Sequence, residues 1–181
     1  MSYQCEQPKN ESELRAVLAL YDVDPSIWKK TCGNLCEELS NGESYLEVDG
    51  AGVLSRVVRI ANVVITSITG ETLRESHQVL PDGTTKNKKN GNLTEKVGQV
   101  ETALGGIIRG IQEELGSTMG AYVGNIRPNG PEGVEYKPSD SFNGFTCVYK
   151  VNRFTADWSG PVEDFSTIDA HDGKRIFWVW K

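Results

Sequence analysis

Residues 101–116 read ETALGGIIRGIQEELG and carry the most informative pattern in the chain. Apolar residues recur at intervals of three and four, which predicts an amphipathic helix from Val100 to Leu115. Gly116 predicts the end of this helix, because glycine tolerates a left-handed backbone. With about 100° of rotation per residue, the apolar arc is centred near Leu104 and Ile111.

A pair of glutamates lies near the end of the predicted helix. The same rotation places Arg109 and Glu113 on the polar side, four residues apart, where an ion pair is worth only about 0.2–0.5 kcal/mol. Glu114 falls on the flank of the apolar arc, where a charge is costly to bury unless something compensates for it. A divalent cation would compensate. The alternative is that both glutamates are solvated residues on an ordinary core helix.

The helix also contains Gly105, Gly106 and Gly110. Each glycine inside a helix costs about 1 kcal/mol relative to alanine. Their presence indicates the close approach of another strand or of a ligand.

The segment resembles a Nudix box, the metal-binding loop and helix of enzymes that hydrolyse nucleoside diphosphates linked to another group. The residues that match without a gap are Glu101, Arg109, Ile111, Glu113, Glu114 and Gly116. Three positions depart from the motif: Glu95 replaces its first glycine, Gly110 replaces the glutamate after the arginine, and Ser117 replaces its last apolar residue. Residues 76–83, 93–97, 165–167 and 178–180 resemble a little-characterised Nudix-like group of plants, algae and fungi. The resemblance therefore covers residues 53–181.

This resemblance implies a metal site. Glu113 and Glu114 would ligate Mg²⁺ or Mn²⁺, which prefer hard oxygen ligands. Arg109 would orient these glutamates, and Glu101 would support the loop or act as an outer-sphere ligand. Gly110 removes one carboxylate from the set, which implies weaker metal binding and a lower rate, down to no activity. The carboxylates that could substitute from elsewhere are Glu132, Glu135, Asp140, Glu163 and Asp164.

The implied function is the Mg²⁺- or Mn²⁺-dependent hydrolysis of a nucleoside diphosphate-linked or similar pyrophosphate substrate. One alternative is a catalytically degenerate Nudix fold that binds a nucleotide or a protein, and another is a generic α/β binding module. Trp178 and Trp180 alternate with Val179 and share a strand face, which serves either core packing or the stacking of a nucleobase. Lys96 is a further candidate for substrate binding. The basic run of residues 86–89 is either a solvated loop or a contact for phosphate.

The remaining pattern predicts an α/β fold. The β-branched and alternating segments at residues 53–68, 73–80, 121–126, 144–154 and 175–180 predict strands. Turns at residues 69–71 and 172–173 predict two hairpins, and residues 129–144 predict a loop. The pattern agrees with a Nudix-like α/β/α sandwich with a mixed sheet over residues 51–181. Residues 1–50 predict an N-terminal helical extension or cap, with helices near residues 10–21 and 25–39.

The net charge and the lengths of the apolar runs argue against nucleic acids and membranes as partners. The net charge of −6 argues against nonspecific nucleic-acid binding, which depends on phosphate neutralisation. No apolar run approaches the roughly 20 residues of a membrane helix, and the polar start lacks a signal peptide, so we expect a cytoplasmic protein without a membrane partner. The four cysteines are expected to be reduced thiols. The expected partner is a small phosphorylated molecule, and a homodimer is left open.

Overall fold

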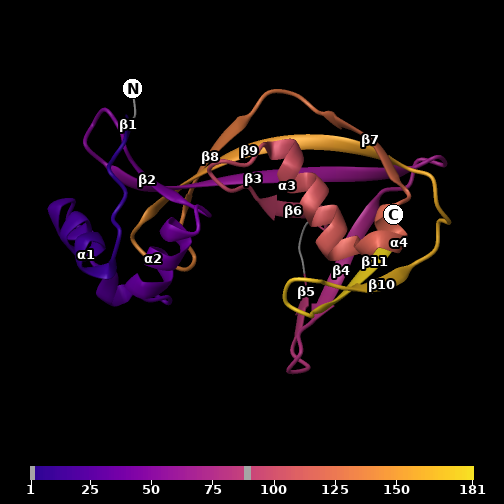
Figure 1. The fold of residues 1–181 in the computed structure, drawn as a ribbon, viewed down its shortest axis with the longest axis horizontal. Coiled ribbons are helices and arrows are strands. Elements are labelled where there is room, and N and C mark those ends of the chain that lie inside the picture. The colour runs from indigo at the N-terminus through magenta and orange to yellow at the C-terminus, as the bar shows by residue number, and fades with distance from the viewer. Residues whose placement is uncertain (1–2, 88–90) are drawn as a thin grey trace. The chain divides into compact units, whose positions relative to one another are not determined.

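The computed structural model describes residues 3–87 and 91–181. It is a mixed α/β protein with helices and two β-sheets (Figure 1), which confirms the predicted class. One sheet has seven strands and the other has four. Within the described ranges, none of the helices has the length and apolar character that crossing a membrane requires.

The chain divides into two compact units, which we describe separately. The first comprises residues 1–60, 96–102 and 132–151, and the second comprises residues 61–95, 103–131 and 152–181. This division differs from the boundary that the sequence predicts at residue 50. The reason is that the long strands β3 (Leu54–Ser67) and β9 (Thr146–Trp158) each contribute residues to both units.

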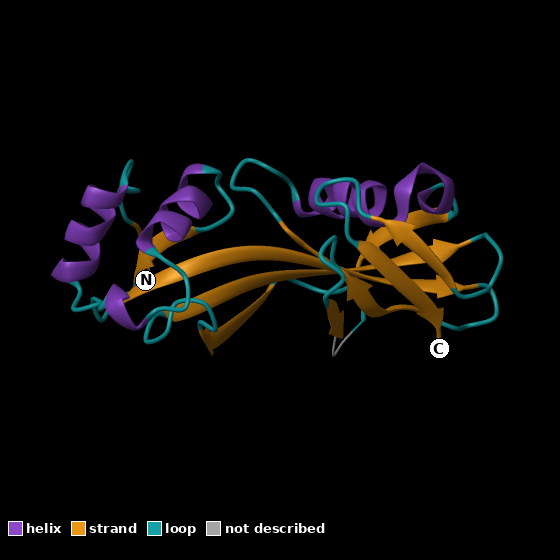
Figure 2. Cartoon of the chain, turned by 90° about the horizontal axis from the view of Figure 1, so that it is seen from below, coloured by secondary structure: helices purple, strands orange, loops and turns teal. Residues whose placement is uncertain are grey.

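The first unit contains helices at the N-terminal end of the chain, as predicted. These are α1 (Glu11–Leu20), the 3-10 turn η1 (Pro25–Ile27) and α2 (Cys32–Ser40), which lie beside strands β1 (Tyr3–Gln4) and β2 (Tyr45–Val48) (Figure 2). The second helix starts later than predicted, because the Thr31 hydroxyl accepts a hydrogen bond from the Asn34 N–H at 3.2 Å and caps the helix there. The buried core of this unit is formed by Leu14, Leu18, Cys32, Leu35, Leu39, Leu46, Val48, Leu54, Phe142 and Phe145.

The predicted loop over residues 129–144 is wrong in part, because it contains strand β8 (Gly133–Pro138). This strand pairs antiparallel with β9, with Val134 opposite Lys150 and Tyr136 opposite Val148. The alternation of Val134 and Tyr136 with charged residues is a strand signal. The glycines and prolines around this strand favour a loop, and they led to the prediction of a loop over the whole segment.

The second unit contains the segment that resembles a Nudix box. Its four-stranded sheet has the order β10-β11-β4-β5. The elements of this unit are β4 (Leu73–Val79), β5 (Thr85–Asn87), β6 (Leu93–Lys96, whose Lys96 falls in the first unit), α3 (Ala103–Gly110), the π-helix η2 (Ile111–Leu115), α4 (Gly116–Gly120), β7 (Val123–Pro128), β10 (Phe165–Ile168) and β11 (Arg175–Trp180).

The turn predicted at residues 69–71 is confirmed, but the predicted hairpin extends over a single antiparallel bridge. Thr66 of β3 pairs with Thr72, which precedes β4, and the chain turns at Gly70 with φ +98°. Beyond this bridge β4 pairs with β11, so the turn carries the chain from one sheet into the other. The hairpin of β10 and β11 is confirmed, with Gly173 at φ +73° in its turn.

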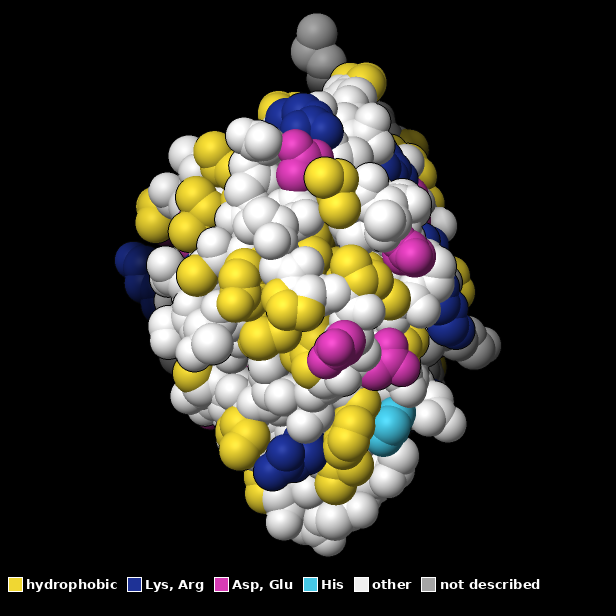
Figure 3. All heavy atoms as spheres, turned by 90° about the vertical axis from the view of Figure 1, so that its right-hand side faces the viewer, with side chains coloured by type: hydrophobic (Ala, Val, Ile, Leu, Met, Phe, Trp, Pro, Cys, Tyr) yellow, Lys and Arg dark blue, Asp and Glu magenta, His cyan; other side chains and the backbone are white. Residues whose placement is uncertain are grey.

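Some apolar side chains remain at the surface. Ile68, Leu104, Ile108 and Ile168 are exposed, and the face drawn in Figure 3 shows hydrophobic side chains (yellow) among polar ones. Scattered apolar residues of this kind are ordinary on protein surfaces. The predicted basic run begins at Lys86, an exposed residue of β5, while Lys88 and Lys89 lie outside the described residues. All four cysteines are free thiols, as predicted.

Candidate functional site

The helix of the Nudix-like segment begins later than predicted and includes a π-helical turn. It begins at Ala103 and changes from α to π geometry at Ile111. Its buried positions recur every four residues, at Ile107, Ile111 and Leu115 and at Gly106, Gly110 and Glu114. An interval of four residues places these side chains on one face of the helix. The predicted centre of the apolar arc is confirmed at Ile111, which is 5% exposed, and is wrong at Leu104, which is 42% exposed.

The guanidinium of Arg109 on this helix joins two carboxylates. Arg109 Nη1 lies 3.1 Å from Glu113 Oε2, which confirms the predicted ion pair. The same nitrogen lies 3.1 Å from Glu95 Oε2, which comes from strand β6. The Glu95 side chain is 14% exposed and that of Glu113 is 28% exposed, so both carboxylates are partly withdrawn from solvent.

Glu95 also occupies the space next to Gly110. A Cβ built on Gly110 would lie 2.2 Å from Glu95 Cγ, 2.8 Å from its Cδ and 3.0 Å from its Oε1. Any side chain at position 110 would overlap with the glutamate. The expectation that a glycine of this helix permits the close approach of a strand is confirmed at Gly110.

This contact predicts a reversed effect of Gly110→Ala. An alanine in a helix is ordinarily more stable than glycine by about 1 kcal/mol. Here the new methyl group would displace Glu95, so we expect a net loss of about 1–3 kcal/mol, as for other overpacked sites. Chemical denaturation of the variant measures the change.

The matched control is Gly33→Ala in helix α2, where a new Cβ would meet only ordinary contacts of 3.4 Å and longer. This control should be neutral or stabilising. In a Glu95→Gly background, Gly110→Ala should lose its destabilising effect. Equal effects of Gly110→Ala in both backgrounds would contradict the steric explanation.

Glu114 faces the interior, as its position on the helix predicts. It is 5% exposed, and its carbonyl accepts a hydrogen bond from the Thr167 hydroxyl of β10. Lys174 acts electrostatically on both Glu114 and Glu95. The ammonium of Lys174 lies 2.8 Å from the carboxylate of Asp169, which is also buried. The candidate site is therefore a cluster of partly buried acidic residues with two cationic side chains.

The protonation equilibria reflect this arrangement. Burial raises the pKa of the Glu95 carboxyl, and the nearby Glu113 carboxylate adds to this, so that the two outweigh Arg109 and Lys174. Burial also opposes the charge on Asp169, but Lys174 and the backbone N–H of His171 hold the pKa of Asp169 below its usual value. The fold thus favours a charged Asp169 and disfavours a charged Glu95.

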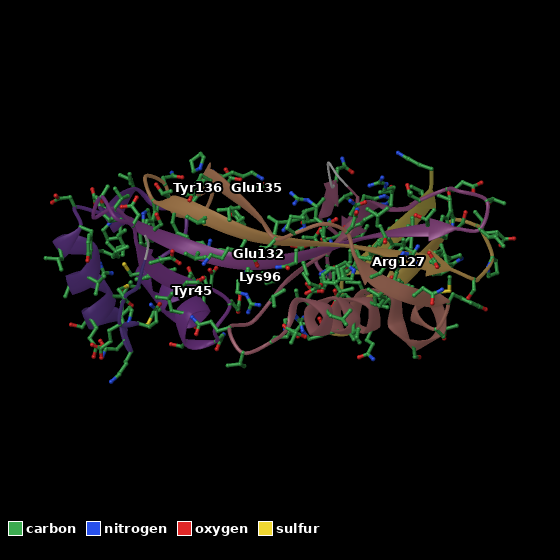
Figure 4. All side chains as sticks on the ribbon, turned by 90° about the horizontal axis from the view of Figure 1, so that it is seen from above. Tyr45, Lys96, Arg127, Glu132, Glu135 and Tyr136 are labelled. Carbon is green, nitrogen blue, oxygen red and sulfur yellow. The ribbon has the colours of Figure 1, made fainter. Side chains whose placement is uncertain are left out.

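Other predicted site residues belong to the first unit. Glu101 Oε2 accepts a hydrogen bond from the Gly98 N–H at 3.2 Å, which supports its own loop. Lys96 Nζ lies 2.7 Å from Glu43 Oε2. Glu132 and Glu135 come from the segment around β8, and Figure 4 labels them together with Lys96. Asp140 is in the first unit as well.

The closing strand places its two tryptophans differently. Trp178 is 1% exposed, and its Nε1 donates to Thr167 Oγ1 at 2.9 Å. Trp180 is less buried, and its Nε1 donates to the Glu163 carbonyl at 3.1 Å while its N–H donates to Asp164. In this structure Trp178 leaves no ring face open for a nucleobase. The substrate role stays a prediction for Trp180.

Sequence reasoning missed Glu95, Lys174 and Asp169 as members of this cluster. Of these three residues, only Glu95 could have been found from the sequence, because it departs from the Nudix motif. Gly110 is a second departure, and the structure shows that the two residues are in contact. Lys174 and Asp169 flank the turn between β10 and β11, and their separation from the helix along the chain gave no indication of proximity.

No protein-family model matches the chain, and a search of the curated proteins found no match. The family resemblance of residues 53–181 therefore stays a prediction. The function is inferred from the geometry of the cluster together with the motif residues.

The carboxylates suit a hard divalent cation by their donor chemistry. The absence of a side chain at Gly110 leaves a space that the Glu95 side chain fills. The Glu95 carboxylate of β6 therefore lies against the helix, where Arg109 pairs with both Glu95 and Glu113. As the side chains stand, no three His, Cys, Asp or Glu residues of the described ranges are grouped to hold a metal ion. Arg109 lies between Glu95 and Glu113, so a divalent ion would have to displace its guanidinium.

Proposed function

We propose that the chain is a Mg²⁺- or Mn²⁺-dependent hydrolase of a nucleoside diphosphate-linked or similar pyrophosphate substrate. The observation that carries the proposal is the packing of Glu95 against Gly110. The motif lacks a carboxylate at this helix position, and Glu95 supplies one from the neighbouring strand. Glu113 and Glu114 lie on the same helix segment and would supply the other oxygen donors.

In this proposal the residues have distinct roles. Glu113 and Glu114 would hold the cation, which would neutralise charge on the phosphate oxygens when bound. In the absence of a cation, Arg109 holds Glu113 and Glu95 through its bridging ion pairs. Thr167 and β10 hold the π-helical turn in place through the Glu114 carbonyl, and the Ala170 N–H donates to the Glu113 carbonyl at 3.0 Å.

The test is a cation titration followed by a hydrolysis panel. We expect wild type to bind Mn²⁺ and to turn over at least one member of a panel of nucleoside diphosphate derivatives. Glu113→Gln and Glu114→Gln should each weaken Mn²⁺ affinity by at least about tenfold, the lower end of what an altered metal-site shell costs. Turnover should fall in parallel. Calorimetry for binding and released phosphate or monophosphate for turnover provide the measurements.

The control is Glu37→Gln, which removes the charge of an exposed glutamate of α2 in the first unit. It should leave both quantities unchanged. Activity that survives Glu114→Gln would show that the assignment of this residue is wrong. Absence of both Mn²⁺ binding and turnover in wild type would exclude the hydrolase.

A second candidate function is a catalytically degenerate module that binds a nucleotide or a protein. The observation that favours it is the position of Arg109, whose guanidinium already neutralises Glu95 and Glu113. A fold stabilised by this internal ion pair has no need of a divalent ion. Nucleotide binding that is independent of Mg²⁺ and Mn²⁺, without turnover, would support this second function.

A further inference from the structure

Strand β8 (Gly133–Pro138) has a free edge in the first unit. Among the described residues it pairs only with β9, so its other side carries no strand. Pro138 lies opposite Thr146, and the next residue, Ser139, donates its N–H to the Phe145 carbonyl at 3.2 Å. Hydrogen-bonded pairs alternate along an antiparallel ladder. The odd-numbered residues of β8 therefore bond to β9, and the even-numbered residues direct their backbone groups to the free edge.

The backbone groups on this edge are able to pair with a further strand. Val134 and Tyr136 each present an N–H and a C=O there, and Pro138 presents a C=O. Proline is tolerated in an edge strand where its missing N–H would face away from the sheet, which agrees with this assignment. A row of such groups at an open edge is a template for pairing with another chain.

The two faces of β8 differ in character. Val134 is 51% exposed and Tyr136 is 73% exposed, and their positions in the strand place them on the same face. On the opposite face, Glu135 Oε2 lies 2.6 Å from Lys137 Nζ. Figure 4 labels Glu135 and Tyr136 of this strand. A strand that pairs with β8 would have to match an apolar face and two opposite charges.

A second copy of β8 meets both requirements. When two such strands pair antiparallel with Tyr136 opposite Tyr136, Glu135 of each copy lies opposite Lys137 of the other. Val134 then lies opposite Pro138. Cross-strand pairs of opposite charge and of aromatic rings stabilise a sheet. Each Tyr136 N–H would donate to the Tyr136 carbonyl of the other copy.

Charge also selects this register over its neighbours. The two nearest registers that keep edge-facing residues opposite one another are displaced by two residues in either direction. One of them places Glu135 opposite Glu135, and the other places Lys137 opposite Lys137. Like charges directly opposite each other destabilise a sheet.

We infer that the free edge of β8 is a self-association surface, on which a second copy of the chain adds its own β8 antiparallel with Tyr136 at the twofold axis. Such a contact is isologous, because the same residues are used on both sides. It consists of one pair of six-residue strands and is smaller than the surface that stable complexes bury. The dimer is therefore expected to be weak and concentration-dependent. The inference is independent of the proposed hydrolase.

The test reverses the two charges singly and together. Glu135→Lys and Lys137→Glu would each place like charges opposite one another, and the double variant Glu135→Lys/Lys137→Glu would restore opposite charges. The two side chains are 35% and 60% exposed, so the variants should fold, which circular dichroism checks. The matched controls are Glu37→Lys and Lys29→Glu, which change the net charge equally at exposed positions of the first unit. Sedimentation velocity of the full chain over a concentration series measures the dimerisation constant.

We expect wild type to dimerise reversibly. Each single variant should lose at least about tenfold in dimer affinity, because it introduces two like-charge pairs per dimer. The double variant and both controls should keep the wild-type affinity. An equimolar mixture of Glu135→Lys and Lys137→Glu should form a heterodimer, since every lysine at these positions in one chain would face a glutamate in the other.

Amide hydrogen exchange tests the backbone pairing directly. The N–H groups of Val134 and Tyr136 should exchange readily at low protein concentration and become protected at high concentration. Those of Glu135 and Lys137, which face β9, should be protected at both concentrations.

The outcomes decide both the surface and its occupant. A wild type that stays monomeric would overturn the inference and leave the edge to a strand of another protein. A dimer that survives both single variants, or that leaves Val134 and Tyr136 unprotected, would show that the copies meet elsewhere. A folded double variant without recovery would overturn the register. Loss in both single variants, with recovery in the double variant and in the mixture, would establish it.

Discussion

Replacement of Glu38 by alanine is expected to lower the free energy of unfolding by about 3–5 kcal/mol, the usual cost of breaking a buried ion pair by removing one partner. Glu38 is 7% exposed in α2, and its partner Arg56 of β3 is 6% exposed. The two side chains form an ion pair. Without Glu38, the guanidinium would keep Cys147 Sγ at 3.1 Å as a weak acceptor, and its buried charge would be uncompensated.

Urea denaturation of wild type, Glu38→Ala and Glu38→Gln measures this effect. The matched control is Glu11→Ala, which removes an exposed i,i+4 ion pair with Arg15 and should cost no more than about 0.5 kcal/mol. Replacing both partners, as in Glu38→Leu/Arg56→Met, should recover much of the loss, because no buried charge would remain. A loss below about 1 kcal/mol for Glu38→Ala would contradict the prediction.

The same ion pair predicts a pH dependence. Burial opposes the charge on Glu38, but Arg56 and Lys96 outweigh it and hold the pKa of Glu38 below its usual value. A carboxyl whose pKa is lowered by folding contributes stability above its unfolded pKa and loses it as the pH falls through the folded value. The difference in stability between wild type and Glu38→Gln should therefore shrink in acid. A difference that grows on acidification would show that the sign is wrong.

Strands are the part of the fold most readily predicted from sequence. The closing strand Arg175–Trp180 has the predicted bounds, and β3 and β4 agree with prediction within one residue at each end. Their β-branched and alternating residues carry the signal locally. The partners of these strands are harder to predict. Nothing local to the turn at Gly70 indicates that β4 pairs with β11, whose residues lie about a hundred positions further along the chain.

The helix is predicted correctly in position and wrongly in geometry. A rotation of about 100° per residue centres the apolar arc near Leu104 and Ile111. The structure buries Ile111, leaves Leu104 exposed and gives residues Ile111–Leu115 π geometry. In the π turn the carbonyls of Glu113 and Glu114 accept hydrogen bonds from Ala170 and Thr167, in β10 and the following turn. Such contacts join positions far apart in sequence, so periodicity alone does not contain them.

The candidate site is predicted only where it lies on the helix. The ion pair of Arg109 with Glu113 and the burial of Glu114 are consequences of helical spacing. In the sequence Glu95 is a departure from a motif, and its contact with the other departure at Gly110 requires the structure. The motif alone predicts that Gly110→Glu strengthens the site. The overlap with Glu95 reverses this expectation.

Replacement of Trp178 by alanine is expected to cost about 3–5 kcal/mol of stability, as for other buried tryptophans. Trp178 is among the largest fully buried side chains, and it packs against Phe165 with ring centroids 6.4 Å apart. Its Nε1 donates to Thr167, whose hydroxyl in turn donates to the Glu114 carbonyl. Loss of the indole would open a cavity and release the hydrogen-bonded support of the π-helical turn.

The matched control is Trp180→Ala on the same strand, where the ring is less buried and the expected loss is smaller. Urea denaturation ranks the two variants, and nucleotide affinity distinguishes packing from substrate stacking. A structural Trp178 predicts a large loss of stability for Trp178→Ala. If Trp178→Ala instead folds with wild-type stability and loses only nucleotide affinity, the ring is a substrate contact. Because Thr167 links Trp178 to the Glu114 carbonyl, the stability of this sheet and the position of the π-helical turn depend on the same side chain.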